Sequence, residues 1–320
     1  MTTPPPFQPR GVIPACLLPF DRDLTIDEPA FRAHLNDVAA VEGITALTIN
    51  AHATEVATCS IEEQERVMAI TMDEVGGRVP VVHGVYSDGS RLAGQIAKRA
   101  QRDGASALLV FPSNTLGMGG HLRPEMAEAH INAVADASDL PIIVFQYPLA
   151  GGLGYPVDTL LRVCDAVPSV VAIKDWCNDA KQHEQQVREL HALPRRVSVL
   201  STHSSWLLPS LMLGCDGLLS GAGSVIAALQ VALFNAVQAG DLTEARQIAD
   251  RLYPTTRAFY DAPFLDMHNR MKEALVHLGR LREAHVRPPL MKLSDAEIRR
   301  IGQAMDAAGL TGETVYSKVA

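Results

Sequence analysis

Short apolar runs and longer segments of helical period alternate along most of this chain. Eight of the apolar runs have the length of strands: residues 11–17, 46–50, 79–84, 107–111, 141–146, 170–174, 197–201 and 217–220. A polar loop and then a helical segment follow each run, and Ser60-Ile61-Glu62-Glu63 has the spacing of a helix-capping box. Strands this apolar that alternate with helices are expected to be parallel and covered on both faces.

Eight such units predict an α/β fold, a (β/α)8 TIM barrel, rather than a doubly wound sheet. A dinucleotide-binding sheet is disfavoured because no GxGxxG motif follows the first apolar run. We expect residues 1–10 to be a flexible lead-in and residues 11–240 to form the barrel. Strand patterns are absent after residue 241, so residues 241–320 are predicted to form a C-terminal helical extension packed on the barrel.

The last apolar run is followed by the small-residue loop Gly221-Ala222-Gly223-Ser224 and then by a helical segment. Backbone N–H groups at the start of a helix can face an anion, so this loop is one candidate for anion binding. A tight turn without a ligand explains the same residues equally well. The pattern leaves both interpretations open.

Composition narrows the class of protein. The chain has 320 residues, is 47% hydrophobic and 20% charged, and carries a formal net charge of -8, which argues against a nucleic-acid partner. No apolar run approaches the length of a membrane span, and the first residues have neither the basic nor the apolar part of a secretory signal. The 5 cysteines are scattered without metal or disulfide spacing, so we expect reduced thiols and a cytoplasmic protein.

Lys174 stands at the end of the sixth run, in Ser169-Val170-Val171-Ala172-Ile173-Lys174-Asp175. A lysine at the end of a buried strand loses hydration, which lowers its pKa and makes the neutral amine accessible. Such an amine can form a Schiff base with a carbonyl substrate. The alternative is a lysine whose head group simply extends to solvent, and this segment alone favours that alternative.

Other chemically capable side chains follow the predicted strands, at the barrel end where the active sites of such folds lie. They are His52, His83, Tyr147 and His203, and together they exceed what a purely structural role would place there. A metal site built from the three histidines is disfavoured, because no HxH or HxxxH spacing occurs and a lysine would repel a divalent cation. We therefore predict neither a metal nor a cofactor.

The chain resembles the class I aldolases of the dihydrodipicolinate synthase and N-acetylneuraminate lyase type, from about residue 11 to about residue 310. The resemblance rests on segments in the correct order and spacing: Gly11-Val12-Ile13-Pro14-Ala15 with Pro19-Phe20, Thr54-Glu55 with Ser60 and Glu63, Ala172-Ile173-Lys174-Asp175, Gly214-Cys215-Asp216-Gly217-Leu218-Leu219-Ser220, and Met271-Lys272-Glu273-Ala274-Leu275 with Gly279 and Arg287-Pro288-Pro289-Leu290. It implies a (β/α)8 barrel, a 2-oxo acid bound as an imine on Lys174, and a homotetramer built as a dimer of dimers.

The chain departs from the family pattern at several polar positions. The family's Gly-Thr-Thr-Gly-Glu motif reads Ala51-His52-Ala53-Thr54-Glu55, so both threonine hydroxyls are replaced. The family's catalytic tyrosine position holds Phe145, with Tyr147 two residues further on. The arginine that synthase members carry after the following proline is Ala150, and the aromatic residue after the fourth strand is absent from Pro112-Ser113-Asn114.

These observations predict a Schiff-base lyase, an aldolase or a dehydratase, for a small 2-oxo acid or 2-oxo-3-deoxy sugar acid, and not a true dihydrodipicolinate synthase. The predicted catalytic residues are Lys174 and, as general acid or base, Tyr147 or His203. The predicted substrate-binding residues are His52, Ala53, Thr54, Phe145 and Leu219. The alternative is a catalytically degenerate barrel that binds an oxo acid without turnover.

Overall fold

The computed structural model describes residues 7–311, so the first part of the predicted lead-in and residues 312–320 of the extension lie outside the described residues. Eight parallel strands form one sheet in the order β1-β8-β7-β6-β5-β4-β3-β2. The strands are β1 (Gly11–Pro14), β2 (Leu47–Ile49), β3 (Val81–Val85), β4 (Ala107–Val110), β5 (Ile142–Gln146), β6 (Val170–Asp175), β7 (Ser198–Ser201) and β8 (Gly217–Ser220). Isolated parallel bridges from Val12 to Ile44 and from Ala15 to Thr48 join the two ends of the sheet.

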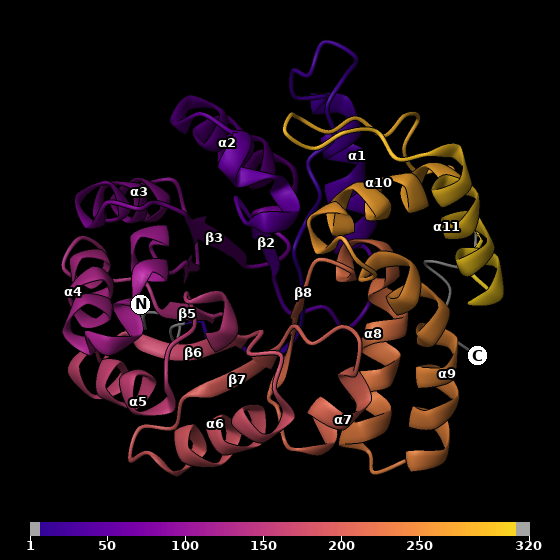
Figure 1. Cartoon of the computed structure of the whole chain (residues 1–320). Coiled ribbons are helices and arrows are strands. Elements are labelled where there is room, and N and C mark those ends of the chain that lie inside the picture. The colour runs from indigo at the N-terminus through magenta and orange to yellow at the C-terminus, as the bar shows by residue number, and fades with distance from the viewer. Residues whose placement is uncertain (1–6, 312–320) are drawn as a thin grey trace.

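Helices alternate with the strands and surround the sheet, so the fold is the (β/α)8 TIM barrel that the sequence predicts (Figure 1). The helices of the barrel are α1 (Glu28–Ala39), α2 (Ile61–Val75), α3 (Ser90–Arg102), α4 (Pro124–Ala135), α5 (Val157–Ala166), α6 (Ala180–Ala192), α7 (Leu207–Met212) and α8 (Gly223–Gln238). The predicted capping box is present at the start of α2, where Ser60 and Glu63 bond each other's backbone N–H.

The first strand is shorter than predicted. The apolar run of residues 11–17 suggested one continuous strand, but β1 ends at Pro14. Ala15, Cys16, Leu17 and Leu18 remain almost fully buried after the strand has ended. Buried residues therefore give the same sequence pattern whether they are hydrogen-bonded in the sheet or packed after the strand has ended. The length of an apolar run alone is thus a poor guide to where a strand ends.

Residues after the barrel form α9 (Leu242–Phe259), the short 3-10 helix η6 (Phe264–Asp266), α10 (Met267–His277) and α11 (Asp295–Ala307). They lie together on one side of the barrel beside α8, as the orange and yellow ribbons of Figure 1 show. Two ion pairs hold these helices in place. Arg270 of α10 binds Glu297 of α11 at 2.7 Å, and Lys272 of α10 binds Glu55 of the loop after β2. No helix within residues 7–311 combines the length and the apolar character needed to cross a bilayer.

Candidate active site

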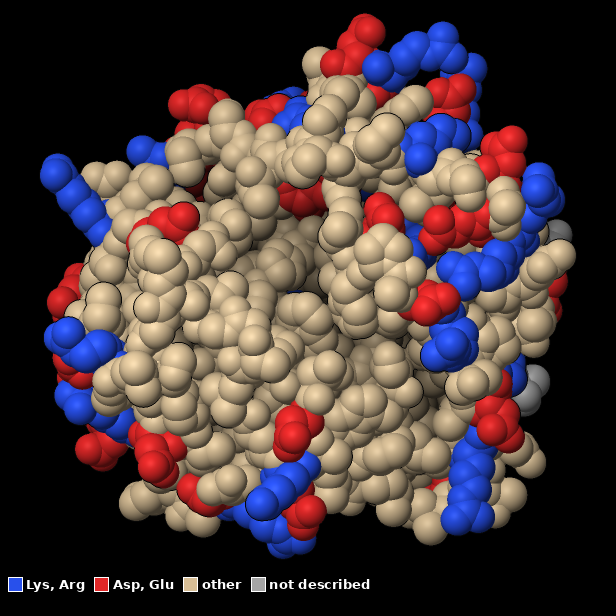
Figure 2. All heavy atoms as spheres, viewed as in Figure 1, with Lys and Arg blue, Asp and Glu red and all other residues tan. Residues whose placement is uncertain are grey.

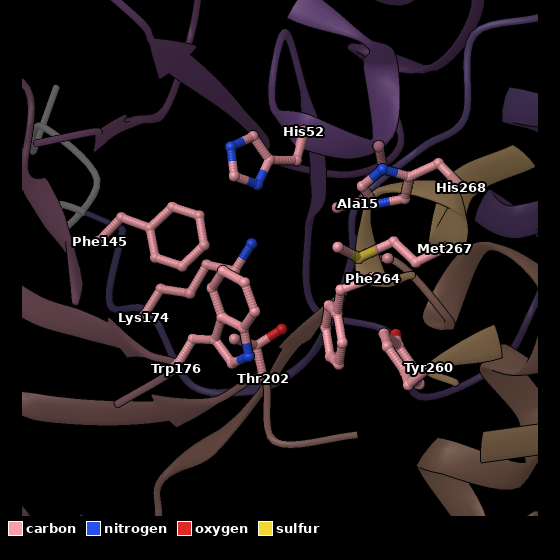
Figure 3. A pocket seen from close by; sticks show the side chains of 12 residues that line it. Ala15, His52, Phe145, Lys174, Trp176, Thr202, Tyr260, Phe264, Met267 and His268 are labelled. Carbon is pink, nitrogen blue, oxygen red and sulfur yellow. The ribbon is translucent and has the colours of Figure 1, made fainter. Parts of the chain in front are cut away.

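A cavity lies at the carboxyl ends of the strands, and its volume is about 390 Å³ when the open space at its mouth is included. Its lining combines residues after β1, β2, β5, β6, β7 and β8 with residues of the C-terminal extension. The lining residues are Ala15, His52, Ala53, Phe145, Lys174, Trp176, Thr202, Gly221, Tyr260, Phe264, Met267 and His268. Figure 3 shows the Lys174 amino group between the rings of Phe145 and His52 on one side and the extension residues on the other.

Lys174 is 4% exposed, and its Nζ lies 4.0 Å from the centroid of the Phe145 ring. The register of the sheet causes this contact, because Phe145 of β5 pairs directly with Lys174 of β6. Within the described residues, no ion pair joins Lys174 to a carboxylate. Burial lowers the pKa of Lys174 to about 7, although the ring beneath it favours the ammonium. A substantial share of the amine is therefore neutral and nucleophilic near pH 7.

Asp175 points to the opposite side of β6, as the alternation of a strand requires. One of its carboxylate oxygens accepts a 2.6 Å hydrogen bond from His183 Nδ1, and both side chains are fully buried. Burial acts against both charges, but the hydrogen bond raises the pKa of His183 to about 10 and holds the pKa of Asp175 below its ordinary value. The pair therefore fixes the end of β6 from outside the barrel, directly behind Lys174.

His203, a predicted acid or base, belongs to this outer cluster and does not line the cavity. Its Nε2 lies 3.7 Å from both Asp175 Oδ1 and Cys177 Sγ, and its ring stacks on Trp206 at 4.3 Å. Cys177 is thus a buried member of the same cluster.

Asp175, Cys177, His183 and His203 have the residue types of a zinc site, and their ligand atoms lie within 4.8 Å of one another. Two ligands on one zinc ion, each bonded at about 2.0–2.1 Å, would be separated by about 3.3 Å. The 2.6 Å between Asp175 and His183 is a direct hydrogen bond and leaves no such space. The geometry therefore favours a hydrogen-bonded cluster that positions β6 over a metal centre.

His52 and Tyr147, which lie far apart in sequence, meet beside Lys174. The Tyr147 hydroxyl and His52 Nε2 are 2.7 Å apart. Burial, and then the nearby Lys174 charge, lower the pKa of His52 to about 3, so its imidazole is neutral, and the tautomer of the ring decides which of the two groups donates the hydrogen bond. Burial also raises the pKa of Tyr147 well above its ordinary value, so the phenol keeps its proton. Tyr147, two residues after Phe145, is thus connected to the cavity through His52, although Tyr147 itself is not among the residues that line the cavity.

The loop after β2 forms the 3-10 helix η1 (His52–Thr54), whose first N–H groups have no partner within the helix. Ala53 lines the cavity, whereas the Thr54 side chain is fully buried and its hydroxyl accepts a hydrogen bond from the Ala51 N–H at 3.1 Å. Glu55 ends this helix with a positive φ of 52° and turns its carboxylate toward Lys272. The loop that carries His52 and Ala53 is therefore fastened to the extension.

Two residues that the sequence analysis considered for the site, Leu219 and His83, lie outside the cavity. Leu219 of β8 is fully buried opposite Ile13 of β1 and is not among the residues that line the cavity. His83 of β3 is buried behind the sheet, where its Nε2 is 2.8 Å from Asn50 Nδ2.

Eight lining residues were not predicted as site residues. Three directly follow strands, Ala15, Thr202 and Gly221, and five have larger side chains, Trp176, Tyr260, Phe264, Met267 and His268. Trp176 is two residues after Lys174 and therefore on the same side of the continuing chain, a spacing that could have identified it. The other four belong to the extension, for which the helical pattern shows a buried face but not the end of the barrel that it covers.

Comparisons with known proteins agree with this geometry. Residues 8–308 match the sequence model of the Dihydrodipicolinate synthetase family. The chain is 31% identical to a 4-hydroxy-tetrahydrodipicolinate synthase of Syntrophus aciditrophicus over 306 residues, covering 95% of this chain and 99% of that protein. A relative of the same name from Rhodopseudomonas palustris is 32% identical over 313 residues, covering 97% and 99% of the two chains.

Solved structures share the fold. The Escherichia coli K12 prophage protein YagE, a member of the dihydrodipicolinic acid synthase family solved in complex with pyruvate, has a TM-score of 0.86 at 24% identity, with 94% of this chain and 99% of that chain covered. A monomeric dihydrodipicolinate synthase variant has a TM-score of 0.84 at 24% identity, with 94% and 97% covered.

Proposed function

The chain belongs to the dihydrodipicolinate synthetase family, whose members are lyases of the class I aldolase type, and on this premise we propose that it acts on a small 2-oxo acid through a Schiff base on Lys174. The observation that carries the proposal is the isolated, buried amine of Lys174, whose pKa burial lowers to about 7. Pyruvate is the first candidate substrate, since a protein of similar fold, YagE, was solved with pyruvate.

In the proposed reaction, the neutral Lys174 amine attacks C2 of the oxo acid, and loss of water gives an iminium ion. The iminium at C2 then accepts the electron pair of a bond at C3. In an aldolase, the C3–C4 bond breaks and leaves an enamine. In a dehydratase, the C3–H bond breaks with loss of the proton to give the enamine, which then expels hydroxide from C4 and leaves a conjugated iminium. Protonation and hydrolysis then release the product and return the free amine.

The carboxylate of the substrate has a place beside η1. The N–H groups of His52 and Ala53 are at the start of this 3-10 helix, and Ala53 lines the cavity near Lys174. Thr54 contributes through the fold of the loop, because its hydroxyl is bonded to the Ala51 N–H. This arrangement replaces the two threonine hydroxyls of the family motif with backbone donors.

Tyr147 is our candidate for moving a proton at the substrate. Its hydroxyl is protonated at neutral pH and bonded to the neutral His52 imidazole at 2.7 Å, so the pair can donate a proton and take it back. His203 is packed outside the barrel against Asp175, and we give it only a positioning role. Phe145 occupies the usual tyrosine position and contributes its ring face beneath the amine.

We further propose that the substrate differs from that of dihydrodipicolinate synthase, although the curated relatives carry that activity in their names. Phe145, His52 and Ala53 replace hydroxyl-bearing residues of the family pattern, and Ala150 replaces a cation. A site with these exchanges has lost hydroxyl groups and a cation that could bind a product with two negative charges. A 2-oxo-3-deoxy sugar acid is the alternative substrate class.

We expect a homotetramer built from dimers, as the family resemblance implies. The loop between β4 and α4 supports this expectation, because Met118 and Leu122 are 91% and 74% exposed there. Sedimentation velocity tests the assembly, and a species of one chain at micromolar concentration, as for the monomeric variant of similar fold, would contradict it.

The proposal is tested by reducing the protein with borohydride in the presence of pyruvate and mapping the product by peptide mass spectrometry. The expected result is one stable adduct, on Lys174. Lys272 serves as the internal control, because it is also buried but is paired with Glu55. Absence of an adduct on Lys174 across a broad panel of 2-oxo acids overturns the lyase proposal. An adduct without turnover of any substrate supports the degenerate, binding-only barrel instead.

A further inference from the structure

The part of the cavity that faces away from the strands is built almost entirely from rings and apolar side chains. Trp176, Tyr260, Phe264 and Met267 form this wall, and Figure 3 shows them below and to the right of the Lys174 amino group. The Trp176 and Phe264 rings are stacked, with centroids 5.5 Å apart and planes 28° from parallel. Tyr147 meets the other side of Trp176, at 5.5 Å.

Charge is lacking around this wall. Of the described residues that line the cavity, only Lys174 is a lysine, arginine, aspartate or glutamate, and in the proposed iminium its charge lies at C2, next to the C1 carboxylate of the substrate. The face of the molecule in Figure 2 agrees, since it is hollowed near its centre and carries most acidic and basic side chains toward its margin. A second carboxylate or a phosphate on the substrate would find no cation there.

Polar groups that could bind several hydroxyls are also few. His52 Nε2 is engaged by the Tyr147 hydroxyl, and the Tyr260 hydroxyl interacts with Ser204 and Ser220. Thr202 and His268 are the remaining polar side chains besides the indole N–H of Trp176. A polyhydroxylated chain in this space would lose hydrogen bonds to water without replacing them.

We propose that the enzyme takes 2-oxo acids whose portion from C4 outward is uncharged and apolar, with a flat aromatic ring held against Trp176 and Phe264. This inference rests on the proposed Schiff-base function. A 4-aryl-4-hydroxy-2-oxobutanoate fits it: C3–C4 cleavage moves that electron pair into the enamine on Lys174, and the C4 hydroxyl loses its proton to leave an aromatic aldehyde. Protonation at C3 and addition of water then release pyruvate and the free amine, so the reaction needs no further reactant.

Phe264 adds a second observation. It is 37% exposed at the mouth of the cavity, on the short η6 helix, although it stacks on Trp176. A ring bound in the cavity would cover this exposed face and extend the stack of Trp176 and Phe264, against which Tyr147 packs edge-on. Aromatic rings gain from offset or edge contacts of this kind beyond the area they bury.

The test uses the full chain, run in the condensation direction with pyruvate and three aldehydes: benzaldehyde, glyceraldehyde and succinic semialdehyde. The expected kcat/KM for benzaldehyde is at least about tenfold above both others, the discrimination that an apolar pocket provides. Equal rates, or a preference for glyceraldehyde or succinic semialdehyde, overturn the inference, and so does trapping of pyruvate on Lys174 without turnover of any aldehyde. Failure of pyruvate and of every other 2-oxo acid in the panel to be trapped on Lys174 overturns the proposed function instead, so the two failures are distinguishable.

A matched pair of variants locates the effect. F264A removes the ring at the mouth and is expected to raise the KM for benzaldehyde at least about tenfold. L265A changes the next residue, which is 61% exposed and does not line the cavity, and is expected to stay within about twofold of the parent. Equal effects of the two substitutions contradict the assignment of Phe264.

Discussion

The protein buries two lysines in two regions that look alike at first. Lys174 lies at the mouth of the barrel with its Nζ 4.0 Å from the centroid of Phe145. Lys272 lies between α10 and the loop after β2, with its Nζ 4.4 Å from the centroid of Phe20. Both are almost completely buried, at 4% and 0% exposed. Each region thus offers a lysine the same burial and the same kind of ring.

The two regions differ in what else faces the ammonium. Lys272 is paired with the Glu55 carboxylate and donates to the His285 carbonyl at 2.8 Å. Burial lowers the pKa of both lysines, but Glu55 offsets part of the effect at Lys272, whereas no carboxylate among the described residues offsets it at Lys174. The comparison shows that the presence of an anionic partner, more than burial itself, separates a structural cation from a nucleophilic amine.

Removing each lysine in turn should give the largest and most contrasting effects. We expect K174M to lose all turnover and adduct formation while remaining at least as stable as the parent, because it removes a charge that burial disfavours. K272M should keep adduct formation but lose about 3–5 kcal/mol of stability, because Glu55 is left buried without its partner. Adduct mapping and thermal unfolding measure both quantities.

The double variant K272M/E55L controls for this effect. It should recover most of the stability that K272M loses, since replacing both members of a buried pair by apolar residues is often nearly neutral. The contrast between the regions fails if K174M proves the less stable of the two single variants.

Substitution of Tyr147 tests whether the region around Lys174 also handles protons. Y147F removes the hydroxyl that binds His52 and is expected to lower kcat by about 10²–10⁴-fold, the usual contribution of a general acid or base. Adduct formation with pyruvate should persist, because the amine is unchanged. Y155F is the matched control: the Tyr155 hydroxyl is buried without a hydrogen-bond partner among the described residues, and its loss should leave kcat almost unchanged.

The pH dependence of adduct formation should follow Lys174 alone. Because the pKa of Lys174 is lowered to about 7 by burial, the rate should fall as the pH decreases through about 7 and level off above it. K272M should show the same profile. The free energy of unfolding should also depend on the ionisation of Lys174, because a lysine in the unfolded chain has a pKa of about 10.4. Unfolding therefore takes up a proton between about pH 7 and 10, stability rises with pH in this window, and K174M should remove that rise.

The aromatic rings should give the smallest effects. F145L removes the ring face beneath Lys174, which stabilises an ammonium by about 0.5–2 kcal/mol, so the midpoint of the pH profile should move to lower pH by roughly one unit. F20L makes the same change beneath Lys272 and should leave the pH profile in place. A shift to higher pH in F145L would show that the ring desolvates the amine more than it stabilises its charge.

The barrel could be predicted from the sequence because its strands are buried on both faces and therefore appear as separate apolar runs. All eight runs contain a strand, although the first run extends three residues past the end of β1. Lys174 was noticed as a single cation at the end of an apolar run, but that run alone favoured a solvent-facing lysine, and the eight strand units and the family resemblance led to its predicted role. The pairing of His52 with Tyr147 was not foreseen, because it depends on the fold of two loops.

The extension could be predicted as helical but not as part of the site. A helical period shows that one face is buried, and it does not show which part of the barrel that face covers. The pair of Lys272 and Glu55 helps to hold α10, which carries His268, over the loop after β2. That contact joins residues 217 positions apart, a distance over which local sequence patterns carry no information.

The cavity-lining residues of the extension stand late in the chain, and their position determines when the cavity becomes complete during synthesis. All eight strands and Lys174 are complete by Ser220, but Tyr260, Phe264, Met267 and His268 are translated later. A nascent chain that has reached only Ser220 carries the amine without the wall that separates it from water. The cavity around Lys174 is therefore complete only after the extension has been synthesised.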